Sequence, residues 1–426
     1  MSKNEDNGRQ EQFAAFVGLD WADQKHDVWL RDAATQQTRH QVIEQSPEGL
    51  SAWVSGLRQQ YPDKRIAVCL EQSRGALIYG LMEYPFLALY PVNPLTLAKY
   101  REAFRPSRAK DDRSDAEFLC ELVTQHRDRL QLWRPDDEQT RLLGLLNEGR
   151  RAAVDLRTQM VQQLLATLKK YFPQALVLIG DDWEGPMVCD FLLQWPDLPS
   201  VQRSKPESVR AFYYGHNCRH PEVVEQRLAL IQQAKPLTTD SAIITTCSMT
   251  VKMLATQIRH LNKAIADYQK QIAKVFAGHP DANIFRSFPG AGNALAPRLL
   301  CVFGSDRDRF ASPTDVQNFT GISPVIERSG KSTWVHWRWA APEFVRQSVH
   351  EFAKCSLPRC AWANAYYQMQ RERGKGHHAA VRAVAFKWLR ILFRCWKDRV
   401  PYDEAVYLQS LARGGSAILK YMATPA

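Results

Sequence analysis

Short runs of continuous apolar residues dominate the first third of the chain. Residues 13–19 are apolar, with β-branched and aromatic members, and this composition predicts a strand buried on both faces. Four more strands are predicted by the same reasoning, near residues 26–32, 37–43, 65–70 and 86–90. Helical spacing predicts helices over 46–61 and 74–82. This order is typical of an α/β domain whose fourth strand lies parallel beside the first.

The middle of the chain changes to a long helical period. Apolar residues recur at three and four over 137–172 and again over 241–276, which predicts two long helices. The intervening segment, at about 178–240, is rich in Pro and Trp, and we predict that it is an irregular structural insert with short helices. Two long helices around a small insert indicate an antiparallel coiled coil that serves as a spacer or a dimerisation device.

The last part of the chain is predicted to be mainly helical. The motif PGAGNALA, residues 289–296, resembles the glycine turn of a helix-hairpin-helix, in which backbone N–H groups approach a phosphate. A tight connection between two helices explains the same glycines equally well. The final region, between Arg371 and Arg399, is predicted to contain a packed helix with an apolar stripe and a basic outer face, suited to a phosphate backbone.

Composition narrows the partners of these domains. The 426 residues predict two or three domains, and the formal net charge of +11 indicates a polyanionic partner, nucleic acid before membrane. No uncharged run reaches the roughly 18 residues of a membrane span, and the polar N-terminus lacks the features of a signal peptide. Nine cysteines without paired zinc spacings are typical of reduced thiols, so a cytoplasmic location is expected.

Four carboxylates stand at positions where chemistry concentrates. Asp20 ends the first predicted strand and Glu71 ends the fourth, so both are expected at the carboxyl edge of the sheet. Asp112 and Asp115 are three apart and share a face of the following helix. Gly18, two residues before Asp20, is expected to leave open space beside it. For Asp112 and Asp115 there is an alternative explanation, because the helix dipole favours acidic residues in the first turn of any helix.

Oxygen ligands of this kind are what hard divalent cations prefer. Two Mg²⁺ ions, with Mn²⁺ as an alternative, stabilise the attacking and leaving oxygens of a phosphoryl displacement. The segment before Asp112 is basic, which predicts that it holds a nucleic-acid backbone through Lys99, Arg101, Arg105, Arg108 and Lys110. On the C-terminal helix the corresponding candidates are Arg382, Lys387, Arg390 and Arg394.

At these residues the chain resembles a known family, the DEDD transposases of the insertion sequence one-ten group, which are bridge-RNA-guided DNA recombinases of mobile elements. The matching pieces occur in the family's order between about residues 13 and 400. They are GLDWADQKHD, the acid in VCLEQS, KDDRSDAEFL, PGAGNALA, NFTGISPVIERSGKS and HHAAVRAVAFKWLRILF. Asp111 departs from the family pattern, because a small polar residue is common at that position.

The resemblance implies a division of labour along the chain. After a tail at 1–12, a RuvC-like (RNase H-like) domain at 13–130 supplies the acids Asp20, Glu71, Asp112 and Asp115. Coiled-coil helices with their insert fill 131–280, and a C-terminal transposase domain at 281–426 supplies a serine nucleophile. That serine matches Ser329, with Lys331 as a nearby nucleic-acid contact, whereas Ser332 remains a competitor. It also implies Mg²⁺ dependence, a covalent 5′-phosphoserine link to DNA, and a dimer or tetramer on donor and target duplexes in the bacterial cytoplasm.

Two other functions remain open on the residues alone. A metal-dependent, structure-selective nuclease such as a junction resolvase would use the four acids and water without a serine. A basic RNA- or DNA-binding scaffold with a degenerate site would need no chemistry at all. The complete acid set disfavours the scaffold, and the large C-terminal half disfavours the simple nuclease.

Overall fold

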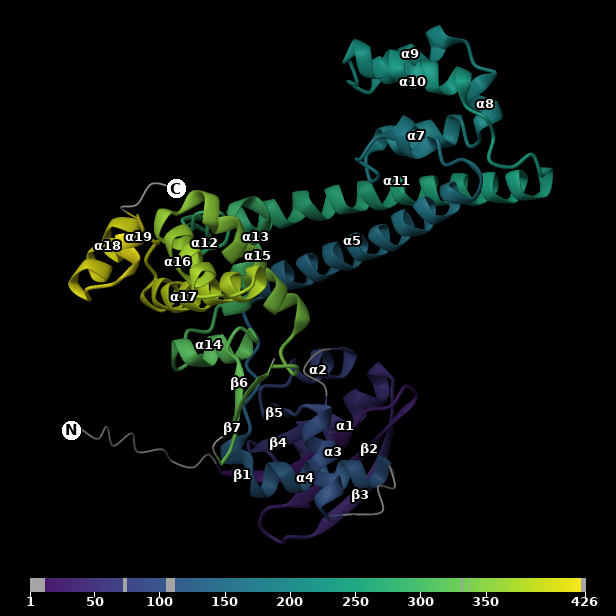
Figure 1. Cartoon of the computed structure of the whole chain (residues 1–426). Helices are drawn as coiled ribbons and strands as arrows, with labels where there is room; N and C mark the ends of the chain where they lie inside the picture. The colour runs from purple at the N-terminus through teal and green to yellow at the C-terminus, as the bar shows by residue number, and fades with distance from the viewer. Residues whose placement is uncertain (1–11, 72–74, 105–111, 331, 337, 423–426) are drawn as a thin grey trace. The chain divides into compact units, whose positions relative to one another are not determined.

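The computed structural model describes residues 12–422 except 72–74, 105–111, 331 and 337, so the predicted tail lies almost entirely outside the described residues. The chain forms two compact units, residues 1–135 and 136–426. In Figure 1 the first unit is coloured purple to blue and the second blue to yellow. Among the described residues, no helix is long and apolar enough to cross a membrane.

The first unit is a five-stranded mixed sheet in the order β3-β2-β1-β4-β5. Strands β1 to β3 pair antiparallel, whereas β4 and β5 run parallel to β1, which confirms the predicted neighbourhood of the first and fourth strands. The strands are β1 (Phe13–Asp20), β2 (Lys25–Asp32), β3 (Thr38–Glu44), β4 (Arg65–Leu70) and β5 (Leu87–Pro91). The helices are α1 (Pro47–Gln60), α2 (Ala76–Leu81), α3 (Pro94–Phe104) and α4 (Asp112–Gln125).

Helices cover both faces of this sheet, which is why β1 reads as a continuous apolar run. On one face, Val17 and Leu19 join a core that includes Val54 and Leu57 of α1. On the other face, the core contains residues of β4 and β5 together with α3 and α4. Ser46 caps α1 by accepting a hydrogen bond from a backbone N–H, as its sequence signature predicts.

The second unit begins with two long helices, α5 (Glu138–Tyr171) and α11 (Ser241–Ala277). Their contacts show that they run antiparallel (Figure 1). Near the start of α5, Gln139 donates to the carbonyl of Val275, and farther along Arg157 donates to the side chain of Asn262. Both helices lie within a residue or two of the ranges predicted from sequence.

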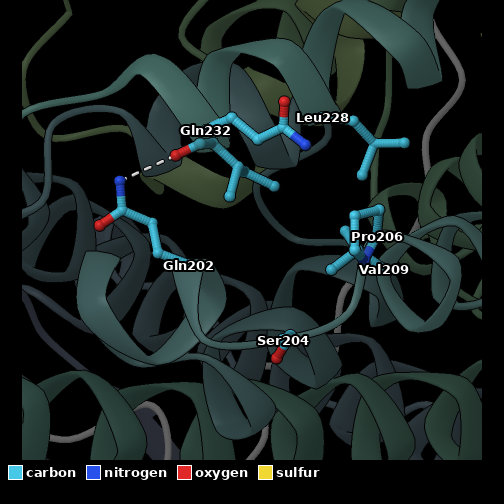
Figure 2. Close-up of a pocket in the computed structure, with 7 residues that line it drawn as sticks. Gln202, Ser204, Pro206, Val209, Leu228 and Gln232 are labelled. Atoms are coloured by element: carbon cyan, nitrogen blue, oxygen red, sulfur yellow. Dashed lines mark hydrogen bonds between the residues drawn. The ribbon is translucent and has the colours of Figure 1, made fainter.

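The insert between the long helices is helical and shares a core with the adjoining parts of α5 and α11, so it is more ordered than its composition predicts. Its helices are α6 (Ala175–Ile179), α7 (Pro186–Gln194), α8 (Leu198–Gln202), α9 (Pro206–Gly215) and α10 (Pro221–Gln233). The insert contains a cavity of about 320 Å³. Figure 2 shows the residues that line it, among them Gln202, which donates to the carbonyl of Ile231. None of the described residues that line this cavity is charged.

The remaining helices pack around one large core that also includes the bases of α5 and α11, whereas β6 and β7 form a separate, largely exposed two-stranded ribbon. The short elements are α12 (Ala282–Arg286), α14 (Pro313–Phe319), β6 (Val325–Ser329), β7 (Ser332–His336) and α19 (Ile418–Met422). The longer ones are α13 (Gly292–Phe303), α15 (Glu343–Ser356), α16 (Ala361–Glu372), α17 (His377–Asp398) and α18 (Glu404–Arg413).

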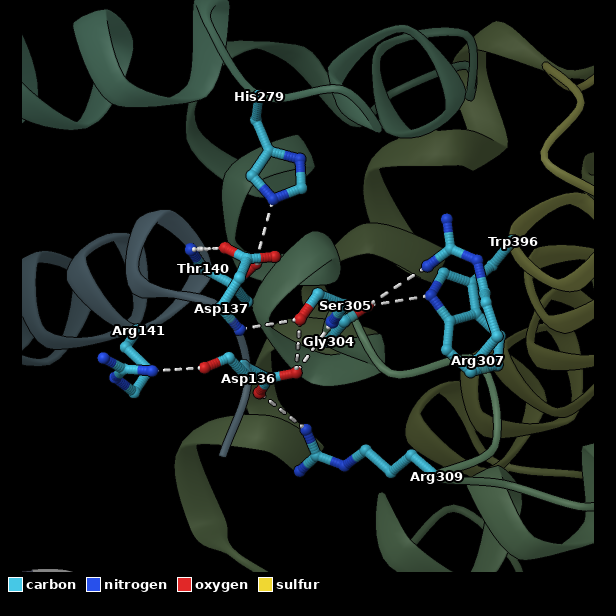
Figure 3. A network of polar contacts seen from close by, with 10 residues as sticks. All are labelled: Asp136, Asp137, Thr140, Arg141, His279, Gly304, Ser305, Arg307, Arg309 and Trp396. Carbon is cyan, nitrogen blue, oxygen red and sulfur yellow. Dashed lines mark hydrogen bonds and ion pairs between the residues drawn. The ribbon is translucent and has the colours of Figure 1, made fainter. Parts of the chain in front are cut away.

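A polar network ties the start of α5 to this core (Figure 3). Asp137 caps the helix by accepting from the N–H of Thr140, and its own N–H donates to the hydroxyl of Ser305. The His279 side chain is buried and contacts the Thr140 hydroxyl at 2.9 Å, while its Nδ1 accepts from the N–H of Asp281. Because Nδ1 is an acceptor, the histidine is held neutral with its proton on Nε2, and burial lowers its pKa.

This histidine predicts a loss of stability in mild acid. The pKa of His279 in the folded chain lies below its unfolded value of 6.5. Just below pH 6.5 the unfolded chain therefore binds a proton at this histidine and the folded chain does not. The contribution of neutral His279 to the stability of the folded state is complete above pH 6.5, and it declines as the pH falls below 6.5. We expect the unfolding temperature of the second unit to drop between pH 7.5 and 5, and His279→Gln to reduce that drop. His350 in the same unit shifts in the same direction, so part of the slope remains. An unchanged slope in His279→Gln would contradict the assignment.

Candidate active site

Asp20 and Glu71 lie at the carboxyl ends of neighbouring parallel strands. The register pairs Leu19 of β1 with Leu70 of β4. The next residue in each case, Asp20 after Leu19 and Glu71 after Leu70, therefore lies at the same level of the sheet. Asp20 is the last residue of β1 and only 9% exposed. By the period of two, both acids project toward the face that α4 covers.

Helix α4 brings its first turn to the same edge of the sheet. The Cys120 thiol donates to the carbonyl of Phe16, and a Cβ built on Gly18 would lie 1.9 Å from the carbonyl oxygen of Ala116. Four helical residues and two strand residues both span roughly 6 Å, so one more turn of α4 reaches the level of Asp20. The helix therefore runs antiparallel to β1 and carries its acidic N-terminal turn to the end of that strand.

The space beside Gly18 is filled, which corrects the expectation that it is open. The backbone of α4 occupies it, because a Cβ there would also meet the Cys120 nitrogen at 2.3 Å. Glycine at this position is what lets the helix approach the strand closely.

Gly18→Ala is therefore expected to force α4 away from β1. Overpacking of this kind costs about 1–3 kcal/mol or more, and here the obstacle is backbone that has no rotamer to change. Urea titration monitored by hydrogen exchange of β1 peptides would measure the loss. Gly56→Ala in the middle of α1, where nothing lies within 4 Å of an added Cβ, is the matched control. The control is expected to stabilise by about 0.5–1 kcal/mol. Equal stability of both variants would contradict the close packing.

The two acids of α4 have different environments. The Asp115 carboxylate is 2% exposed and receives two hydrogen bonds from Arg101 of α3, at 2.7 and 2.8 Å. Asp112, the first residue of the helix, is exposed. Arg101 is thus an internal partner of Asp115, whereas the sequence pattern had placed it among the cations that face a nucleic acid. A bidentate pair of this kind holds Asp115 in one orientation.

A fifth carboxylate lies across the hairpin from Asp20. The β1–β2 register pairs Asp20 with Asp27, so both side chains are on the same face of the sheet. The Asp27 carboxylate contacts Nε2 of His40 at 2.6 Å. Sequence reasoning missed it, although the seven-residue spacing across the short turn would have indicated the pairing.

The donor chemistry of this edge suits a hard divalent cation, because all of its candidate ligands are carboxylates. The arrangement described here is not a closed metal cluster. Among the described residues, no three His, Cys, Asp or Glu side chains converge closely enough to hold an ion. The Asp115 carboxylate is paired with Arg101 instead, whose guanidinium supplies a positive charge at this edge.

Ser329 lies in a β-hairpin of the second unit, where the sequence predicted a polar loop. It is the last residue of β6 and pairs with Ser332, the first residue of β7. Gly330 begins the two-residue turn with φ of +56°, the left-handed conformation that such tight hairpins favour. Ser329 and Ser332 are both exposed and, as a cross-strand pair, present their hydroxyls on one face of the ribbon.

The predicted nucleic-acid contacts fall into three groups. Arg105, Arg108, Lys110 and Lys331 lie outside the described residues. On α17, Arg390 and Arg394 are exposed, and Arg394 pairs with Asp398 at 3.5 Å. Arg382 and Lys387 are partly buried instead, and burial lowers the pKa of each.

The glycine turn of PGAGNALA connects α12 to α13. An added Cβ at Gly290 would lie 2.5 Å from the carbonyl oxygen of Cys355 in α15, so this glycine serves close packing inside the unit. The second glycine, Gly292, has open space around it. Packing therefore explains the first glycine without a phosphate.

Comparisons with known proteins agree with this layout. Residues 17–173 match a family model described as a transposase, and residues 282–368 match one described as a transposase of the IS116/IS110/IS902 family. Similar proteins include the IS117 mini-circle protein of Streptomyces coelicolor, 26% identical over 93% of this chain and 97% of its own length. Another is the 42 kDa protein of insertion element IS900 from Mycobacterium paratuberculosis, 25% identical over 80% and 84%. The 43.6 kDa protein of IS110 from Streptomyces coelicolor is 21% identical over 92% and 96%.

The two family matches cover the acidic edge of the sheet and part of the helical unit that follows the insert. The chain is thus a DNA transposase by class. It belongs to the IS110 family of transposases.

Proposed function

We propose that this transposase cuts and rejoins donor and target DNA as a site-specific recombinase. In this proposal the first unit is a RuvC-like DEDD domain that uses Asp20, Glu71, Asp112 and Asp115, and the second unit supplies a serine nucleophile, Ser329. The observation that carries it is the antiparallel docking of α4 on β1, which brings the acidic first turn to the edge where Asp20 and Glu71 stand. The strand order, with three antiparallel strands followed by two parallel ones, supports the RuvC-like comparison.

The four acids would hold divalent metal, Mg²⁺ or alternatively Mn²⁺. A bound ion of this kind supplies Lewis-acid stabilisation to the charged phosphoryl oxygens. For Asp115 to serve as a ligand, its bonds to Arg101 must open, and the released guanidinium would then be available to a phosphate. The burial of Asp20 limits its exposure to water and strengthens its interaction with any cation held there.

Ser329 would form the covalent intermediate. Its hydroxyl loses a proton, Oγ bonds to phosphorus, and the bond from phosphorus to the 3′ oxygen breaks, releasing a 3′-hydroxyl once that oxygen takes up a proton. The 5′-phosphoserine ester keeps the energy of the phosphodiester, so the reverse attack rejoins strands without a cofactor. The exposed place of Ser329 beside the hairpin turn supports this role, since the hydroxyl is accessible to a bulky duplex.

A guide RNA would choose the DNA sequence, and the protein would act as a homo-oligomer, a dimer or tetramer. The net charge of +11 supports binding to nucleic-acid backbones, with Arg390 and Arg394 as exposed contacts on α17. The alternative is a junction-resolving endonuclease that uses the acids and water. The carboxylate edge by itself is compatible with that alternative, so the covalent link is the feature that separates the two.

The guide is testable by isolation. We expect the full chain, purified from cells that carry its mobile element, to retain one structured RNA transcribed from that element. Sequencing the bound RNA and comparing it with total RNA measures the enrichment. The same preparation should recombine donor and target duplexes, and nuclease treatment of the RNA should abolish exchange. Bound RNA that merely mirrors the cellular pool, with exchange unaffected by its removal, would contradict guidance.

A further inference from the structure

A second cavity, of about 420 Å³, lies in the second unit at the base of the β6–β7 hairpin. Its wall is built from the segment that leads into β6, from the end of β7, and from α16 and α17. Its volume falls within the range of roughly 300–1,000 Å³ that is usual for small-ligand sites. Neither the acids of the first unit nor Ser329 belongs to it.

The polar part of this wall is cationic. Four basic side chains line the cavity, and none of the described lining residues is acidic; the four are His336, Arg338, Lys375 and Arg382. Arg338 donates from Nη2 to the side chain of Asn318 at 3.1 Å. Its Nε is buried and has no hydrogen-bond partner among the described residues. A buried guanidinium N–H without an acceptor favours a ligand that brings one.

The surroundings of Arg382 are positive as well. His350 of α15 has its pKa lowered to about 4, first by burial and then by the charges of His378, Arg382 and His377. Nδ1 of His378 approaches Nε2 of His350 at 3.5 Å. His350 is therefore neutral near pH 7, and the positive charge on this side of the cavity comes from Arg382, with Lys375 also in the wall. An anion placed between these two side chains would be attracted by both.

The rest of the wall is apolar and aromatic. Tyr366 of α16 and Phe386 of α17 are half-buried and line the cavity together with Val335 and Ile322. The ammonium of Lys387 lies 4.7 Å from the centre of the Tyr366 ring, which holds that ring against α17. Aromatic rings beside cations are the combination by which proteins bind an unstacked base and its phosphate.

We infer that this cavity receives one unstacked nucleotide of a nucleic-acid strand, its phosphate on Lys375, Arg382 and Arg338 and its base against Tyr366 and Phe386. The inference rests on the proposed function only in assuming that the ligand is nucleic acid. A five-residue ribbon spans roughly 16 Å, so the cavity and Ser329 lie at opposite ends of the same hairpin. A strand that passes along the ribbon would therefore be held several nucleotides from the serine.

The test uses the full chain and the fluorescent nucleotide 2-aminopurine deoxyriboside 5′-monophosphate, whose emission is quenched when the base stacks. We expect saturable quenching by the wild type. Lys375→Gln and Arg382→Gln should each weaken binding about tenfold, the size expected for one charged hydrogen bond. Tyr366→Leu should reduce the quenching itself, whereas Arg413→Gln, in the last turn of α18 and outside the cavity, should change nothing. Thermal unfolding of each variant verifies that the second unit is intact.

Several outcomes would overturn the inference. One is the absence of quenching by the wild type, and another is probe binding by the Lys375 and Arg382 variants that equals binding by the wild type. A third is competition by inorganic phosphate as strong as competition by the nucleotide, which would mean an anion site only. Displacement of the probe by an acidic peptide at lower concentration than by the nucleotide would assign the cavity to a protein partner. Ser329→Ala should bind the probe normally. If the covalent adduct at Ser329 is not found, the probe-binding result can therefore still be interpreted. If the probe does not bind, the test of the covalent adduct is unaffected.

Discussion

Asp20→Asn is expected to lower DNA strand cleavage by about a hundredfold or more while leaving the fold intact. The change keeps the size of the side chain and removes only its charge. Asp20 is nearly buried at the end of β1, where Glu71 and the first turn of α4 also lie. Loss of one charged ligand weakens the affinity of the remaining carboxylates for a divalent ion. Cleavage of duplex DNA under saturating Mg²⁺ measures the effect, and Mn²⁺ binding followed by electron paramagnetic resonance measures the ion directly.

Asp20 is a better residue for this test than Asp115, because substitution of Asp115 would change the stability of the fold as well as the metal site. Asp115→Ala removes a buried carboxylate from its pair with the partly buried Arg101, and breaking such a pair costs up to about 3–5 kcal/mol. Asp32→Asn is a suitable control for Asp20→Asn, because Asp32 pairs with Ala15 toward the opposite end of the same strands. The control should cleave DNA normally. Normal cleavage by Asp20→Asn in Mg²⁺ would remove Asp20 from the metal site, and a comparable loss in Asp27→Asn would add its cross-strand partner to that site.

Ser329→Ala is expected to abolish a covalent protein–DNA adduct that the wild type forms with nicked target DNA. A recombinase that rejoins strands must keep the phosphodiester energy in a protein bond, whereas a nuclease that uses water leaves free ends. Denaturing gels with end-labelled DNA detect the adduct as a band of reduced mobility. Mn²⁺ binding should survive in this variant, because the four carboxylates of the first unit are unchanged.

Ser332→Ala is the matched control, and the hairpin makes it a demanding one. Ser329 and Ser332 form a cross-strand pair with both hydroxyls on one exposed face, so they differ little in accessibility. An adduct that persists in Ser329→Ala but disappears in Ser332→Ala would mean that the site is correct and the residue is not. Cleavage without any adduct, on any substrate, would favour the junction-resolving nuclease.

Much of the fold follows from local patterns. The apolar run of β1 and the period of three and four in α5 and α11 predicted these elements closely. A strand buried on both faces is apolar at every position, whereas a helix buried along one stripe is apolar at every third or fourth position. The insert was read as irregular because its helices are short and each begins or ends near Pro or Gly. Only their joint packing shows that they enclose a core.

The candidate site was less predictable than the fold. Gly18 looked like a source of open space, but the sequence cannot show which segment fills the gap left by a missing side chain, and here it is the backbone of α4. Arg101 belongs to a basic run, yet it turns inward to Asp115. In both cases the deciding neighbour lies in a different element, α4 for Gly18 and the facing helices α3 and α4 for the ion pair.

By itself the sequence determined the order of β1 to β5 with α1 and α2, the two long helices, the parallel neighbourhood of β1 and β4, and the four carboxylates with their places at element ends. These follow from interactions within a few residues and from the rules that connect consecutive elements. The sequence did not predict α3 as a helix or the β6–β7 hairpin. Tertiary structure alone decided that α4 runs antiparallel to β1, that Asp27 stands opposite Asp20, that two serines share one face of a hairpin, and that Arg382 lines a cavity. Each of these depends on the register or docking of one element on another, which burial and close packing select among many arrangements that the local pattern permits equally.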